Sequence, residues 1–251
     1  LKKEEVFTLL KRTTTPTTIY KKQKMDRDDI IDITDFDVVA YIKAEMRMML
    51  DEEIARAILV GDGRSTSSDD KIPETNIRPI AKDEDLYTIK APVAVAKDAT
   101  EDAIAKAFIR TVIKTRKEYK GSGSPTLFTT EDMLTNCLLL EDNNGRIIYD
   151  SVDKLATTLR VKEIVPVEVM EGVTRTAGAK NLPLMAILVN LNDYYVGADK
   201  GGAINMFDDF DIDYNQEKYL IETRISGALV KPYSATAFEL DKAQAEEIQD
   251  E

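Results

Sequence analysis

The stretch that decides the fold is IDITDFDVVAYIKAEMRMMLDEEIARAILVGDG, residues Ile31–Gly63. Apolar residues recur along it at the three- and four-residue spacing of one helical face, which predicts a helix over residues 36–60. At about 1.5 Å per residue this helix would be roughly 35 Å long, enough to act as a spine along which other elements pack. Its apolar positions are Val39, Ile42, Met46, Met49, Leu50, Ile54, Ala57 and Ile58.

Both ends of this helix carry recognisable signals. Thr34 and Asp37 form a Thr-x-x-Asp pattern, in which the hydroxyl caps backbone N–H groups and the carboxylate complements the helix dipole. Gly61 and Gly63 end the helix, and we expect one of them to adopt a positive φ. Glu53 interrupts the apolar face, so we expect an ion pair to hold it.

Composition excludes several kinds of function. The chain has 251 residues, 43% of them hydrophobic, and a net charge of -12, which disfavours a specific nucleic-acid site. There is no apolar run long enough to cross a membrane. Histidine is absent, and Cys137 is the single cysteine, so no imidazole triad and no internal disulfide can form.

A polar arm precedes the spine helix. Residues 11–25 read KRTTTPTTIYKKQKM, a segment rich in threonine with basic flanks and few apolar side chains. One interpretation is a mobile polar loop, and the other is a two-stranded arm that packs on another subunit. Because burial of apolar area would contribute little, we expect the arm to be ordered only against a neighbour.

Helices and strands alternate through the rest of the chain, which favours an α+β fold. Two segments could suggest chemistry. Asp209, Asp211 and Asp213 alternate along a predicted strand, but the glycine and distal glutamate of a calcium loop are missing. Cys137 lies in an apolar run, which is typical of a core thiol. We therefore predict no catalytic residues, no metal and no cofactor.

The order of elements resembles the major capsid protein of tailed bacteriophages, a fold shared with encapsulins. A polar arm, a long capped helix, a mixed domain and a final pair of long strands follow one another over nearly the whole chain. The segments that carry the resemblance are TDFDVVAYIKAEMRMMLDEEIARAILVGDGR (Thr34–Arg64), IRPI (Ile77–Ile80) and RISGALVKPYSA (Arg224–Ala235).

The resemblance implies a division of the chain into domains. Residues 1–29 would form an N-terminal arm and an extended loop, with the loop itself at roughly Thr8–Asp29. Residues 30–82 and 203–251 would form a peripheral domain around the spine helix, and residues 83–202 an axial domain. The loop would contact a neighbouring subunit through Arg12, Thr14, Pro16, Tyr20, Lys21, Lys22 and Lys24, while Thr34, Asp37, Gly61 and Gly63 would have structural roles.

The resemblance also implies partners and a location. The subunit would self-assemble as hexamers and pentamers into an icosahedral head, together with a portal, a scaffold or protease, and decoration proteins. Assembly would take place in the host cytoplasm. Some members of the family cross-link a loop lysine to an asparagine; the three lysines of this loop have no identifiable asparagine partner, so that activity is not assigned. Leu1 is expected to be an end produced by cleavage of a scaffolding extension.

Two other functions remain open at this point. One is an encapsulin-type nanocompartment, whose shell has the same subunit fold. The other, more remote, is an acidic metal-dependent enzyme that uses Asp209, Asp211 and Asp213.

Overall fold

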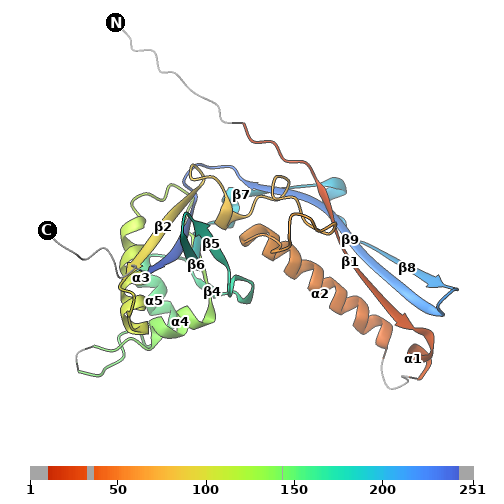
Figure 1. The fold of residues 1–251 in the computed structure, drawn as a ribbon, viewed down its shortest axis with the longest axis horizontal. Helices are drawn as coiled ribbons and strands as arrows, with labels where there is room; N and C mark the ends of the chain where they lie inside the picture. Colours follow the sequence, from red (N-terminus) through yellow and green to blue (C-terminus); the bar gives the residue numbers. More distant parts are fainter. Residues whose placement is uncertain (1–10, 33–36, 143, 243–251) are drawn as a thin grey trace, which may run out of the picture.

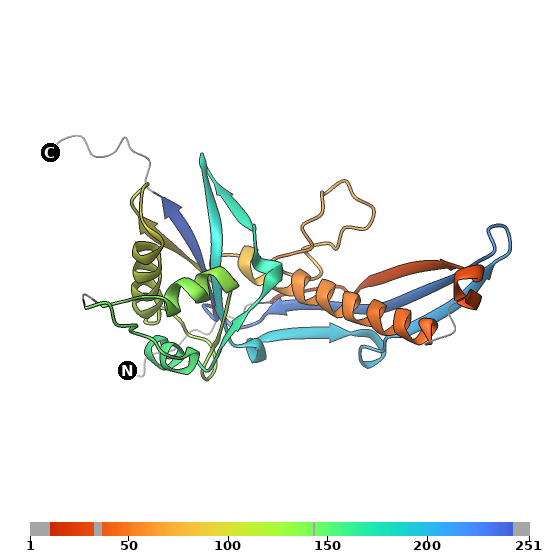
Figure 2. The ribbon, with the colours of Figure 1, turned by 90° about the horizontal axis from the view of Figure 1, so that it is seen from below.

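The computed structural model describes residues 11–32, 37–142 and 144–242, which form two lobes (Figures 1 and 2). An elongated lobe contains the long helix α2 (Val38–Leu59) and a four-stranded sheet. A rounder lobe contains a six-stranded sheet with helices packed against it. The α+β class predicted from the sequence is confirmed.

The four-stranded sheet is organised around β9 (Gln216–Leu229). Strand β1 (Thr17–Asp26) pairs antiparallel with one edge of β9. Strands β8 (Asn205–Asp211) and β7 (Tyr194–Ala198) pair with successive parts of the other edge. The sheet therefore joins residues from the beginning and the end of the chain.

The arm does not behave as expected. All of β1 pairs with β9 of the same chain, from Thr17 opposite Ile225 to Asp26 opposite Gln216. Ile19 is only 2% exposed and packs in the cluster beneath α2. The expectation of order only against a neighbour was wrong, because it neglected the backbone ladder and the burial of this one isoleucine. A short helix, α1 (Arg27–Asp32), follows β1.

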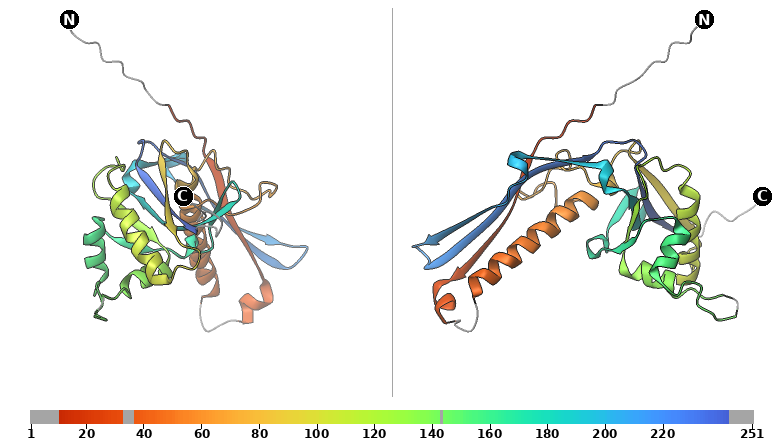
Figure 3. Two further views of the ribbon diagram at one scale, coloured as in Figure 1. Left: turned by 60° about the vertical axis from the view of Figure 1, so that its left-hand side comes forward. Right: turned by 180° about the vertical axis from the view of Figure 1, so that it is seen from behind.

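Helix α2 lies along the sheet of the elongated lobe (Figure 3). Met46, Leu50 and Ala57 are buried against the strands, as the apolar spacing predicts. Met49, which was also assigned to the apolar face, is 46% exposed. A sheet of few strands covers only a narrow stripe of the helix, so a residue at the margin of that stripe stays in solvent.

The ends of α2 agree with the sequence in part. Asp37 is the N-cap, and its carboxylate accepts the Ala40 N–H at 3.0 Å, so the helix begins at Val38 rather than at 36. The predicted cap Thr34 lies outside the described residues. At the other end Gly61 has φ +90° and Gly63 φ +72°, which confirms the expected positive φ.

The six-stranded sheet has the order β2-β10-β6-β3-β4, with β5 paired to β6. Strand β10 runs parallel to β2 and antiparallel to β6. The strands are β2 (Thr88–Val95), β3 (Thr126–Thr129), β4 (Ile164–Pro166), β5 (Thr174–Ala177), β6 (Lys180–Val189) and β10 (Ala235–Lys242).

The two faces of this sheet contact different elements. In β6, Ala186 and Leu188 pack against helices, whereas Ile187 and Val189 point to the other side, as alternation along a strand requires. The helices are α3 (Glu101–Thr115), α4 (Glu131–Leu138) and α5 (Val152–Leu159). The opposite cluster includes the C-terminal end of α2 and the short 3-10 helices η1 (Ile80–Lys82) and η2 (Glu168–Met170). Two further 3-10 turns, η3 (Leu191–Asp193) and η4 (Asp199–Gly201), flank β7.

Residues 235–242 lie in the sheet of the rounder lobe. The sequence analysis assigned them to the peripheral domain, in the segment 203–251 with the spine helix. In the structure they form β10, which is hydrogen-bonded between β2 and β6. Residues 194–198 were expected in the axial domain, 83–202, but they form β7, which pairs with β9 in the elongated lobe. Residues 243–251 lie outside the described residues.

Candidate functional site

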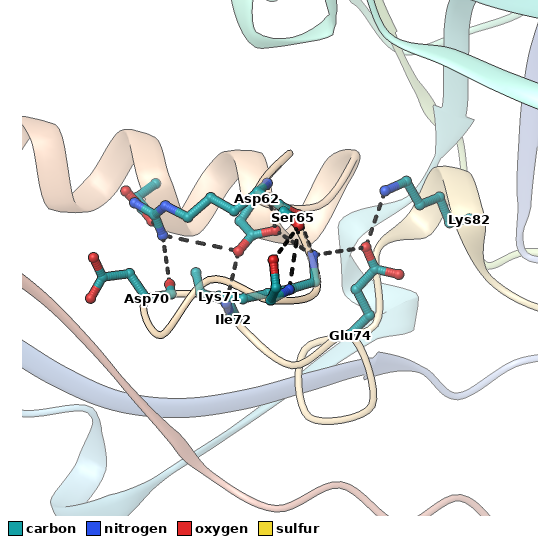
Figure 4. Close-up of polar contacts among 10 residues, drawn as sticks. Asp62, Ser65, Asp70, Lys71, Ile72, Glu74 and Lys82 are labelled. Carbon is teal, nitrogen blue, oxygen red and sulfur yellow. Dashed lines mark hydrogen bonds and ion pairs between the residues drawn. The ribbon is translucent and has the colours of Figure 1, made fainter.

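A cluster of polar contacts follows the end of α2, in the loop that returns toward β9 (Figure 4). The Asp62 side chain is 0% exposed. Its carboxylate accepts the Ile72 N–H at 2.8 Å, the Lys71 ammonium at 3.0 Å and the Arg64 N–H at 3.3 Å. These contacts fix the loop 62–72 as a closed unit against the helix end.

The same loop carries further ion pairs that reach the rounder lobe. Glu74 accepts the Lys82 ammonium of η1 at 3.1 Å and lies 3.8 Å from Lys71 (Figure 4). Gly61 is enclosed by this group: a Cβ atom there would meet Glu74 Oε1 and Lys82 Nζ at 3.2 Å and Pro79 Cγ at 3.3 Å. Glycine at 61 therefore meets two requirements, the positive φ and the close packing.

Glu53 joins α2, the loop and β1. Its carboxylate pairs with Arg64 of the loop and with Lys21 of β1, and this confirms the predicted ion pair. Arg64 also donates to the Asp70 carbonyl at 2.9 Å. A partly buried acid within the apolar stripe thus holds three separate segments together.

The pKa of Asp62 lies below its ordinary value of 3.8. Burial alone would raise it, since a buried carboxylate loses water. The bonds from the Ile72 N–H, the Lys71 ammonium and the Arg64 N–H favour the charged form and prevail. Asp62 is therefore ionised at neutral pH and stabilises the folded loop in that form.

A second polar site joins the arm to the junction of the two lobes. The Arg12 guanidinium donates to both oxygens of the buried Asp83, at 2.8 and 2.5 Å, and to the Leu229 carbonyl at 2.7 Å. It stacks on the Tyr87 ring with 3.7 Å to the centroid. Leu229 ends β9 and Tyr87 immediately precedes β2, so Arg12 contacts both sheets at once.

Most of the arm residues predicted to contact a neighbour have partners in their own chain. Besides Arg12 and Lys21, Thr14 donates to Ser226 Oγ at 3.2 Å, and the Tyr20 hydroxyl donates to Asp70 at 2.6 Å. A groove of about 530 Å³ lies between β1 and the loop 64–73. The remaining candidates are Pro16, which is half-buried, and Lys22 and Lys24, which are exposed. Contact of any of these seven residues with another subunit stays a prediction.

The segments that suggested chemistry occupy ordinary structural positions. Cys137 is buried in the core, and burial raises the pKa of its thiol to about 12. Asp209 and Asp211 lie on β8, where Asp211 pairs with Lys218, but Asp213 falls in the turn after the strand. Within the described ranges, no group of three or more His, Cys, Asp or Glu side chains could hold a metal ion. None of the helices in these ranges is both long and apolar enough to cross a membrane.

The sequence analysis missed several residues on which the polar contacts of both sites depend. Asp62 and Lys71 were not selected, although Asp62 stands in a Gly-Asp-Gly turn, where short acidic side chains commonly bond to the following backbone. Asp83 and the pair of Arg175 with the buried Glu239, joined at 2.6 and 2.5 Å, were missed as well. Their partners are 64 to 71 residues away in sequence, so no local pattern could reveal them.

Comparison with known proteins supports one family. The model of the phage capsid family matches residues 2–239. Comparison with curated protein sequences gives no match. Among solved structures, a protein of Mycobacterium phage Cain is similar with a TM-score of 0.61 and 9% identity, over 91% of this chain and 73% of that chain.

Two other solved structures have the same fold. A chain from the capsid of the native GTA particle gives a TM-score of 0.59 and 11% identity, covering 91% of this chain and 73% of that chain. A protein of Gordonia phage Cozz gives 0.58 and 12% identity, covering 97% and 79%. The chain therefore belongs to the phage capsid family, and it is a structural protein that forms a capsid as a homo-oligomer.

Proposed function

We propose that this chain is the repeating subunit of an icosahedral head shell that encloses a phage genome and is built from hexamers and pentamers. The observation that carries the proposal is the family match over residues 2–239 on a two-lobed chain. The proposal is also supported by large apolar side chains in solvent on the elongated lobe, because such groups are commonly covered by a partner. They are Met48, Met49, Phe207, Ile212 and Tyr214.

The domain division follows the two sheets. We assign the peripheral domain to α2 with β1, β7, β8 and β9, and the axial domain to the six-stranded sheet with α3, α4 and α5. The pairing of β10 with β2 and β6 supports giving residues 235–242 to the axial domain. Pairing of β7 with β9 supports giving residues 194–198 to the peripheral domain.

Contacts between subunits would involve the outward face of β1. Lys22 and Lys24 are exposed there, and Tyr20 lies on the same side of the strand. Arg12, Thr14 and Lys21 already have intrachain partners, so we assign them to positioning the arm. We keep a portal, a scaffold or protease, decoration proteins and assembly in the host cytoplasm as parts of this proposal.

The two alternative functions have less support. The family model that matches is that of phage capsids, which favours a phage head over a nanocompartment. The metal-dependent enzyme would need the carboxylates of Asp209, Asp211 and Asp213 to converge, but Asp211 pairs with Lys218 and accepts the Asp213 N–H at 3.2 Å.

Electron microscopy of the purified chain, combined with mass measurement of the particles, tests the proposal. We expect closed shells with pentameric and hexameric units, made of this chain alone or with a scaffold. A chain that stays monomeric over a wide range of concentration and salt, with and without a co-expressed scaffold and protease, would refute it.

A further inference from the structure

Helix α3 and the turn that follows it carry a row of exposed basic side chains. Lys106, Arg110 and Lys114 follow one another at four-residue spacing on one side of α3, and Lys117 lies in the turn after it. The row is here called the basic face of α3, and the acids Asp102 and Glu118 stand at its two ends. Exposed helical faces usually mix both signs, and this chain has a net charge of -12. A row of four basic side chains on so acidic a chain is suited to an acidic partner.

These basic side chains are not neutralised within the chain. Among the described residues, Lys106, Arg110 and Lys114 make no ion pair within 4.0 Å, and Lys117 reaches only its neighbour Glu118 at 3.8 Å. Ile113 lies between them and is 41% exposed. The basic face of α3 thus combines positive charges that lack a strong ion pair with the exposed apolar side chain of Ile113. Such a combination is typical of a surface that binds a partner.

An acidic counterpart exists elsewhere in the same lobe. Residues 131–153, here called the α4–α5 segment, contain Arg146 as their one basic residue. Leu139 and Ile147 of this segment are largely exposed. Its exposed acids are Glu131, Asp132, Glu141, Asp142, Asp150 and Asp153, of which Asp150 also pairs with Lys154, just beyond the segment, at 3.5 Å. The segment therefore matches the α3 face in charge and also offers apolar side chains opposite Ile113.

The fold places the two surfaces toward different edges of one sheet. The three helices α3, α4 and α5 pack against one another in one layer; within it α3 covers β2, at one end of the strand order, and α5 contacts β4, at the other end (Figures 1 and 2). Two complementary patches at different places on one subunit form a contact between unlike surfaces. Such contacts repeat from one copy to the next, and they close into a ring when the rotation that relates neighbouring copies is a whole fraction of a full turn.

We propose that the basic face of α3 docks on the acidic α4–α5 segment of a second copy of this chain. The inference rests on the proposed function, because it assigns a contact within the shell. Copies that each carry a net charge of -12 repel one another, so their association needs local attraction of this kind. Individual exposed pairs are weak and screened by salt, but a ring repeats each contact at every junction.

Charge reversal tests the pairing. The first variant, Lys106→Glu with Arg110→Glu and Lys114→Glu, should lose shells at concentrations at which the parent chain assembles. A second variant reverses the acidic segment through Glu141→Lys, Asp150→Lys and Asp153→Lys and should fail in the same way. A third variant carries all six changes, so that α3 becomes acidic and the α4–α5 segment becomes basic. It should form shells again, because the two surfaces are again opposite in charge.

A matched control separates the contact from the net charge. Lys162→Glu with Lys231→Glu and Lys242→Glu changes the net charge by the same amount at exposed positions outside α3 and the α4–α5 segment, and it should keep shells. Thermal melts of unassembled subunits should be alike for all variants, so that lost assembly does not reflect misfolding.

The other outcomes overturn the proposal. If the α3 variant assembles like the parent, or the control loses shells equally, the pairing is wrong while the shell function stands. If the α3 variant forms normal shells but retains less DNA, the basic face meets nucleic acid and not a second copy. If the parent chain forms no shells at all, the proposed function fails and the pairing fails with it.

Discussion

Asp62 offers the sharpest test of how the spine helix is joined to the loop that follows it. Replacing Asp62 by Ala removes the acceptor of the Ile72 N–H and of the Lys71 ammonium, at 2.8 and 3.0 Å. Hydrogen bonds to charged groups contribute about 1.5–3 kcal/mol each. Lys71 keeps the Arg64 carbonyl at 2.9 Å, so we expect the lower end for the pair, about 3 kcal/mol in total.

Urea unfolding of unassembled subunits measures this loss. With an m-value of about 3 kcal/mol per M, the midpoint of Asp62→Ala should fall by about 1 M. Asp62→Asn keeps an oxygen for the Ile72 N–H but loses the charge, so it should lose about half as much free energy. Asp69→Ala, an exposed acid in the same loop, is the matched control and should change stability by less than about 0.5 kcal/mol.

The pH dependence gives a second reading of the same contact. Because the pKa of Asp62 is lowered in the folded state, its contribution is fully present above the ordinary value of 3.8 and is lost as the pH falls through the folded pKa. The difference in unfolding free energy between the parent chain and Asp62→Asn should therefore shrink in acid. Equal losses for Asp62→Ala and Asp69→Ala, or a difference that grows as the pH falls, would refute the reasoning.

Three further changes test other features by thermal or urea unfolding and amide exchange. Arg12→Ala leaves Asp83 unpaired and should cost about 3 kcal/mol, while its exposed neighbour Lys11→Ala should be nearly neutral; equal effects would contradict the anchor. Gly61→Ala should cost more than Gly178→Ala, because both have positive φ but only Gly61 is enclosed. Ile19→Ala should cost about 2–4 kcal/mol and speed amide exchange along β1; rapid exchange of β1 in the parent subunit would show that the strand is not held.

The sequence was informative where the signals are local. The apolar spacing and the glycines located α2 to within two residues at each end. Hydroxyl side chains likewise mark the starts of α3, α4 and α5, whose N-caps are Thr100, Thr130 and Ser151. Short-range hydrogen bonds and one helical face determine such elements, so a window of a dozen residues contains the necessary information.

Pairings between distant strands could not be predicted in the same way. Strand β1 has almost no apolar pattern of its own, and its partner β9 begins 190 residues after β1 ends. Nothing local in residues 235–242 indicates which of two sheets they join. The Asp62 and Arg12 contacts depend on those pairings, because they form only where separate segments have been brought together.

The position of β10 has a consequence for how the chain is made. Residues 235–242 fill the place between β2 and β6, and β9 supplies the centre of the other sheet, so the two sheets cannot both be completed until β9 and β10 have left the ribosome. Folding must then join segments far apart in sequence, which is intrinsically slow. A truncated translation product lacks a central strand in its rounder lobe and exposes the edges of β2 and β6. Such products cannot present the finished surface of the rounder lobe, so a growing particle would accept only chains synthesised through β10.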